Sequence, residues 1–204
     1  TDMSNMFEGC YSLTSLDVSN FDTNNVIDMS YIFSKCSGLT ELDLSNFNTS
    51  GVTNMKYMFD GCESLTEVDL SNFNTSNVTD MRQMFEGCES LTSLDVSNFD
   101  TSNVTDMRQM FNCCSGLTSL DLSNFDVSKV TNMNMMFNKC ENLQVLNVST
   151  WEVEHITSYT RILDKCTSLR TLIIKEGTYD WWCERLEEEE LSCDIIEEVN
   201  TLNV

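Results

Sequence analysis

Hydrophobic and polar positions recur along this chain at a fixed step of 26 residues. A leucine, two phenylalanines and a cysteine return once in nearly every step. The cysteine column comprises Cys10, Cys36, Cys62, Cys88, Cys114, Cys140 and Cys166. Such self-similarity is the signature of a repeat protein, in which each copy buries its apolar side only by stacking on its neighbours. The period therefore predicts about six and a half stacked copies of one 26-residue unit.

The first half of each unit has the pattern of a half-buried strand. In residues 91–99, Leu94 and Val96 alternate with Ser93, Asp95 and Ser97. Alternation with a period of two indicates a strand with one buried face. Stacked copies would align these strands in a parallel sheet, about 4.8 Å apart. A phenylalanine follows each strand, and we expect this column to lie inside: Phe21, Phe47, Phe73, Phe99 and Phe125.

The second half has the apolar spacing of a short helix. From Val104 to Cys114, apolar residues fall at i, i+3, i+6, i+7 and i+10, which places them on one helical stripe. Thr79 or Asp80 could cap such a helix, and a glycine at Gly61 or Gly87 would end it.

A short basic stripe follows the predicted helix face, at Lys56, Arg82 and Arg108. Acidic residues four positions later predict the surface pairs Lys56 with Asp60 and Arg82 with Glu86. Tyr31 and Tyr57 occupy the adjacent column, which changes from copy to copy. They form a candidate second contact patch.

These halves predict an α/β solenoid of the leucine-rich-repeat type, with one parallel strand and one short helix per 26 residues. The solenoid would span residues 1–174, with a partial first copy. Residues 175–204 are not a repeat and are predicted to form a helical cap. Trp182 and Leu186 lie four apart, and one helical face would continue through Leu191, Ile195, Val199 and Leu202.

The unit resembles the 26-residue repeat of the BspA-like leucine-rich-repeat family of bacterial surface proteins. The resemblance rests on LTEVDLSNFNTS at residues 65–76, followed by VTDM at 78–81 and Met84-Phe85, and it extends over residues 1–174. It implies a secreted or surface-exposed protein that acts in adhesion and protein binding, without a catalytic motif. Because similar repeats occur in cytosolic and large-virus proteins, those locations stay open.

Charge and composition narrow the partners. The chain carries 33 Asp and Glu against 11 Lys and Arg, a net charge of −22. This balance argues against nucleic acids and anionic lipid surfaces, since both require a basic footprint. No apolar run reaches the roughly 18 residues that a transmembrane helix requires. A protein partner of basic character, or self-association, is the expectation that remains.

The sequence offers little for catalysis or cofactors. His155 is the one histidine, and no phosphate loop, nucleophile elbow or zinc-protease motif occurs. The cysteine column lies at an apolar position without a C-x-x-C spacing, which predicts buried free thiols and no metal. Cys183 and Cys193 lie outside this column, and their pairing stays open. We expect no enzyme activity and no cofactor.

The candidate ligand-binding site is the acidic strand face, defined as Asp17, Asp43, Asp69, Asp95, Asp121, Glu41 and Glu67. The five aspartates share one outward strand position, so neighbouring carboxylates would lie about 5 Å apart. Either each is a structural partner of the serine two residues later, or the column binds cations or a basic protein. The leading hypothesis is a binding or adhesion module that uses this face. The alternative is a structural protein that packs laterally in a shell or filament.

Overall fold

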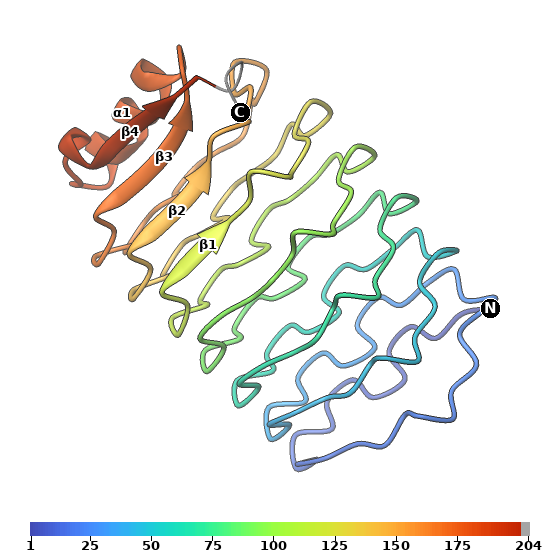
Figure 1. Ribbon diagram of the computed structural model, residues 1–204. Helices are drawn as coiled ribbons and strands as arrows, with labels where there is room; N and C mark the ends of the chain where they lie inside the picture. Colours follow the sequence, from blue (N-terminus) through green and yellow to red (C-terminus); the bar gives the residue numbers. More distant parts are fainter. Residues whose placement is uncertain (201–204) are drawn as a thin grey trace.

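The structure, a computed structural model, describes residues 1–200 as a row of similar coils (Figure 1). The chain begins at one end of the row, and its non-repeated part lies at the other. Successive coils are joined by parallel bridges at a 26-residue step, beginning with Asp2 to Asp28, Asp28 to Asn54 and Asn54 to Asp80. The predicted period and its parallel stacking are therefore confirmed.

A parallel sheet of four strands forms towards the C-terminal end. Its strands lie in the order β1 (Ser119–Asp121), β2 (Val145–Val148), β3 (Thr171–Lys175) and β4 (Ile196–Val199). Ser119 pairs with Val145 and Val145 with Thr171, one repeat apart. The earlier strand segments, residues 13–19, 39–45, 65–71 and 91–97, are not assigned as strands. Within residues 1–200, one backbone hydrogen bond joins two of them, from Thr66 to Thr40. The prediction of one strand per repeat thus holds for the later repeats alone.

The predicted short helix of each repeat is wrong: in residues 1–174 this half of the unit is a run of tight turns. Tyr57, Gln83 and Gln109 have φ angles of 58°, 57° and 56°, in the left-handed region that interrupts a right-handed helix. Alternate backbone N–H groups also point to the next coil; Tyr57, for example, donates to the Arg82 carbonyl at 2.9 Å. Hydrogen bonding between coils therefore replaces the i to i−4 bonds of a helix.

The glycines assigned to helix ends do adopt the left-handed conformation. Gly61 and Gly87 have φ angles of 68° and 70°, but they lie in these turns. Four-residue turns and a helix bring similar positions inward, because residues three or four apart return to the same side in both. The apolar spacing alone could not distinguish the two.

Aromatic columns form the centre of the core. Rings of the column Phe33, Phe59, Phe85, Phe111 and Phe137 lie 5.5–5.9 Å apart between centroids. The column that was predicted to be internal is also buried, at Phe47, Phe73, Phe99 and Phe125. Phe21, in the first coil, is half-buried because that coil has a neighbour on one side. Offset stacked rings at these distances stabilise the core beyond the area that they bury.

The cysteine column explains why a thiol recurs at that position. Each buried Sγ donates to a phenylalanine carbonyl of the preceding coil, at 3.0–3.3 Å, in Cys36, Cys62, Cys88, Cys114, Cys140 and Cys166. Burial raises the pKa of Cys36 to about 11 and that of Cys166 to about 12. The column therefore consists of protonated, free thiols in the core, as predicted.

An asparagine column, which the sequence analysis missed, links the same coils. The Nδ2 groups of Asn72, Asn98 and Asn124 each donate to carbonyls one repeat earlier, at 2.8–3.4 Å. Thr150 occupies this column in the next repeat, and there Trp151 Nε1 donates to the Leu122 carbonyl at 3.2 Å. The tryptophan thus supplies the donor that threonine lacks. The signal was present in the sequence as an invariant Asn before each Phe.

The non-repeated end combines a helix with the added strand β4. In α1 (Tyr179–Glu188), Trp182 and Leu186 are fully buried, and Trp182 lies 6.3 Å from Trp151 between ring centroids. Glu190, with a φ of 61°, follows the helix, and the Leu191 N–H donates back to the Leu186 carbonyl.

The predicted continuation of that helical face is wrong, because the chain turns away after α1. Ile195 lies in the 3-10 helix η1 (Cys193–Ile195), and Val199 ends β4, which pairs with β3. Leu202 lies outside the described residues. Cys183 and Cys193 form a disulfide that joins α1 to η1.

Candidate ligand-binding face

Six of the seven residues of the acidic strand face line one hollow in the first four repeats. This hollow has a volume of about 870 Å³. Its lining is Ser15, Leu16, Asp17, Glu41, Leu42, Asp43, Glu67, Val68, Asp69, Ser93 and Asp95. Asp121 lies farther along the same face and lines a neighbouring hollow of about 510 Å³ together with Asp95. The two hollows follow one another along the row of coils.

Each aspartate of the face also closes a local turn. Oδ1 of Asp43, Asp69 and Asp95 accepts the backbone N–H of the serine two residues later, at 2.9 Å in each case. Hydrogen bonds from this backbone N–H and from the serine hydroxyl hold the pKa of each of these carboxyl groups below its ordinary value. The carboxylates are nevertheless exposed and ionised at neutral pH. The structural and the ligand-binding interpretations are therefore compatible, because the bond to serine leaves the charge facing solvent.

Charge accounts for the position of the hollow. Outward positions carry Glu41 with Asp43 and Glu67 with Asp69 in the open region. The corresponding residues of β2 are Val145 and Asn147. Two like charges about 5 Å apart repel by roughly 0.8 kcal/mol in bulk water, and by more at a protein surface. The inter-strand bonds are thus missing where charged rows adjoin and present where the rows are neutral.

The open region exposes two further kinds of group. Between the acidic rows, Leu16 and Val68 are partly exposed and provide an apolar floor. Backbone N–H and C=O groups of these segments, unlike those of β2 and β3, are not paired across the coils in residues 1–97 apart from the Thr66 to Thr40 bond. Carboxylates beside unpaired backbone and aliphatic surface suit an extended basic chain, whose methylene stems can contact the floor.

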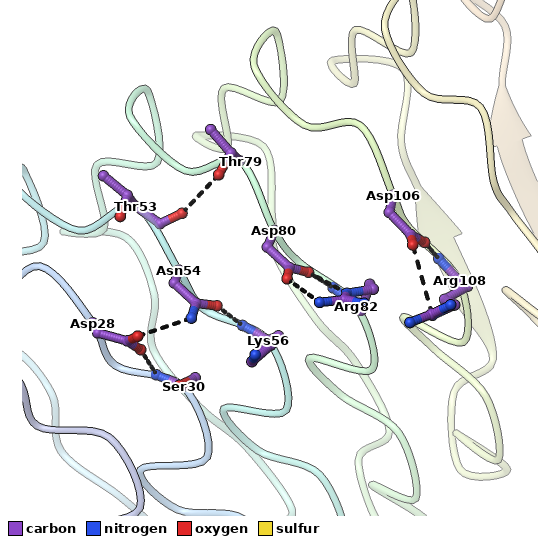
Figure 2. A network of polar contacts seen from close by, with 10 residues as sticks. All are labelled: Asp28, Ser30, Thr53, Asn54, Lys56, Thr79, Asp80, Arg82, Asp106 and Arg108. Carbon is purple, nitrogen blue, oxygen red and sulfur yellow. Dashed lines mark hydrogen bonds and ion pairs between the residues drawn. The ribbon is translucent and has the colours of Figure 1, made fainter.

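The opposite, turn-built side of the coils neutralises its own basic residues (Figure 2). Arg82 binds Asp80 through Nε and Nη2, at 2.8 and 2.5 Å, and Arg108 lies 3.6 Å from Asp106. The predicted i,i+4 pairs are therefore wrong. Without a helix, the nearest acid is the one two residues earlier, whose side chain also accepts the arginine's backbone N–H.

The candidate second patch is brought together by stacking. The rings of Tyr31 and Tyr57 lie 4.4 Å apart and nearly parallel, and Lys56 Nζ lies 5.8 Å from the Tyr31 ring centroid. Both tyrosines are half-buried. No hollow that we describe includes them.

Groups suited to catalysis or metal binding are few. The ring of His155 bonds to the Val127 carbonyl at 2.9 Å through Nε2, a contact between coils. In the part of the chain that the structure describes, one group of three potential metal ligands occurs, Cys183, Glu187 and Cys193. It lies in the non-repeated end, outside the acidic strand face.

Comparison with known families accounts for nearly the whole chain. A family model described as "Mycoplasma protein of unknown function, DUF285" matches residues 1–94 and again residues 90–182. The chain belongs to the DUF285 family. Its two DUF285 matches lie in tandem, and each covers several of the 26-residue units. Neither a curated protein nor a solved structure matches the chain. Among residues 1–200 of this DUF285 protein, no helix has the length and apolar character needed to cross a membrane.

Proposed function

We propose that this DUF285 chain is a non-enzymatic protein-binding module whose acidic strand face holds a basic segment of a partner protein. The observation that carries the proposal is the hollow of about 870 Å³ that six of the seven acidic residues line. Its architecture would be a solenoid of the BspA-like leucine-rich-repeat type. That resemblance also favours an adhesive role at a cell surface or after secretion.

Electrostatics makes a basic partner the best match. Carboxylates repeated along one line concentrate negative potential, and a chain with a net charge of −22 reinforces it. A lysine- or arginine-rich segment lying along the row would relieve the repulsion between neighbouring aspartates. Such complementarity mainly raises association rates and fixes register, and it weakens as salt screens the charges.

The same carboxylates are poorly suited to acid–base catalysis. Hydrolases that use paired carboxyl groups keep their pKa values apart through different surroundings. Here Asp43, Asp69 and Asp95 share one environment, and their pKa values shift in the same direction for the same cause. A binding role uses this uniformity, whereas catalysis would require it to be broken.

A matched pair of triple variants tests the proposal. In the test variant, Asp43→Asn, Asp69→Asn and Asp95→Asn remove three charges from the face while each side chain can still accept its serine N–H. In the control, Asp22→Asn, Asp100→Asn and Asp126→Asn remove three charges from another column whose aspartates make the same kind of turn bond. The probe is a short lysine-rich peptide, titrated calorimetrically at low and at physiological salt.

We expect the test variant to bind the peptide at least tenfold more weakly and to lose most of its salt dependence, while the control changes little. Equal losses in both variants would show that net charge alone attracts the peptide and would contradict a site on the strand face. If neither variant differs from the wild-type protein and sedimentation shows self-association, lateral assembly becomes the better explanation.

A further inference from the structure

The non-repeated end brings two cysteines and a carboxylate to one point. Cys183 and Glu187 are one turn apart on α1, and Cys193 begins η1. Glu187 Oε1 lies 3.9 Å from Cys183 Sγ and 4.0 Å from Cys193 Sγ. Neither cysteine is fully buried, and Glu187 is exposed. The group is therefore accessible from solvent, in contrast to the thiols of the cysteine column.

We propose that reduction of the Cys183–Cys193 disulfide converts this corner into a binding site for a zinc-type divalent cation. The ligands would be the two thiolates and the Glu187 carboxylate, with water in a fourth position. Thiolates bind zinc and similar borderline-soft cations in preference to calcium or magnesium, which prefer oxygen ligands. This site is independent of the acidic strand face and of the function proposed for it.

The positions of the ligands require little rearrangement. With Zn–S and Zn–O bonds of about 2.3 and 2.1 Å, tetrahedral geometry places sulfur and oxygen roughly 3.6 Å apart and the two sulfurs roughly 3.8 Å apart. The observed sulfur–oxygen separations are within about half an ångström of that value. The Cα atoms of the cysteines lie 5.2 Å apart, so side-chain rotation alone can separate the sulfurs by the required amount.

The chemistry balances with a dithiol as the reductant. The dithiol transfers two electrons and two protons to the Cys183–Cys193 sulfurs and becomes a disulfide itself, leaving two cysteine thiols. Binding of the cation then displaces the two thiol protons, and Glu187 contributes its carboxylate. Reoxidation by a disulfide-type oxidant would remove two electrons from the sulfurs, re-form the bond and release the cation.

The surrounding helix should survive reduction. Trp182 and Leu186 hold α1 against the last coil through fully buried side chains. Tyr159 and Trp181 add an edge-to-face contact at 5.3 Å between ring centroids. These contacts do not involve the disulfide, so the ligand positions on α1 persist when it opens.

Cobalt uptake by the full chain tests the proposal, because thiolate-to-cobalt charge transfer reports sulfur ligation directly. The protein is reduced with dithiothreitol, desalted without oxygen and titrated with Co²⁺, and zinc is then added to displace the cobalt. We expect one equivalent of cobalt to bind in the reduced protein, with no charge-transfer band in the oxidised protein. The pair Cys183→Ser and Cys193→Ser should abolish the band.

Single variants isolate the contribution of each ligand. Glu187→Gln should weaken cobalt binding at least tenfold, whereas Glu197→Gln, which removes one charge from an exposed position in β4, should leave it unchanged. Cys113→Ser should also have no effect, although Cys113 is a free, half-exposed thiol. A reduced wild-type protein without the band, a band retained by the double serine variant, or equal affinities for Glu187→Gln and wild type would each overturn the proposal.

Discussion

The first four repeats and the last three use the same unit but are joined differently across their strand segments. In residues 13–97, one backbone bond connects the segments, while the rows beside them carry up to two acidic residues per repeat. From β1 to β3, neighbouring strands are paired in register, and Asp121 is followed by Asn147 and Ile173 in its column. Elsewhere the two regions share their turns, their aromatic column and their thiol bonds.

The difference shows that sheet formation is not what holds these coils together. The aromatic column and the bonds from cysteine to carbonyl continue through both regions without interruption. The strand bonds are then free to vary with surface charge. An acidic row opens the face and leaves groups available to a ligand, and a neutral row closes it.

The largest expected effect tests this shared core. Phe59→Ala in the open region and Phe137→Ala in the paired region should each reduce the free energy of unfolding by about 3–5 kcal/mol. Both side chains are fully buried between two aromatic neighbours, so both leave a comparable cavity. Urea titration followed by circular dichroism measures the loss.

Tyr11→Ala is the control for that comparison, because Tyr11 is aromatic but 60% exposed. Its stability should change by less than about 0.5 kcal/mol. A loss below about 1 kcal/mol at Phe59, together with a full loss at Phe137, would mean that the strand bonds carry the stability after all.

A smaller effect should follow from introducing charge into the paired region. Asn147→Asp places a carboxylate beside its register partner Asp121, and the repulsion should lower stability by about 1 kcal/mol at low salt. The Leu122 N–H, which donates to the Asn147 carbonyl at 2.8 Å, should exchange with deuterium faster. Added salt should restore both quantities. Thr150→Asp adds the same charge off the column, and an equal response there would contradict the repulsion argument.

The smallest effect concerns a second column that changes from acid to amide between the regions, at Ser34, Asp60, Glu86, Asn112 and Asn138. Burial raises the pKa of Asp60, a hydrogen bond from Ser34 opposes this rise, and the Glu86 charge adds to it. Since the folded pKa exceeds the unfolded one, ionised Asp60 opposes folding at neutral pH. Asp60→Asn should therefore stabilise the protein slightly, by less than about 1 kcal/mol.

The pH dependence of this gain has a definite sign. It should be greatest at neutral pH and disappear as the pH falls below the unfolded value of about 3.9, where the carboxyl group is protonated in both states. Thermal melts of both proteins from neutral to acidic pH measure the gap. A gap that widens on acidification would contradict the assigned cause.

The sequence by itself determined the period, the parallel stacking and the buried columns. A column repeated every 26 residues can satisfy its apolar side chains only against its own copies, so Phe73 and Cys88 had to lie inside. It also identified the acidic residues and placed them on one outward face. Those inferences needed no more than side-chain character and spacing.

Only the tertiary structure decided what joins one coil to the next. Turns and a short helix bring Met81, Met84 and Phe85 inward alike, and the choice between them rests on backbone N–H groups that find carbonyls in the neighbouring coil. Whether strands pair depends on how closely charged rows approach, as at Asp69 beside Asp43. The meeting of Glu187 with Cys193 depends on the turn after α1, which no local pattern encodes. Each of these follows from distances between residues far apart in the chain, and the spacing of residues along the chain does not specify such distances.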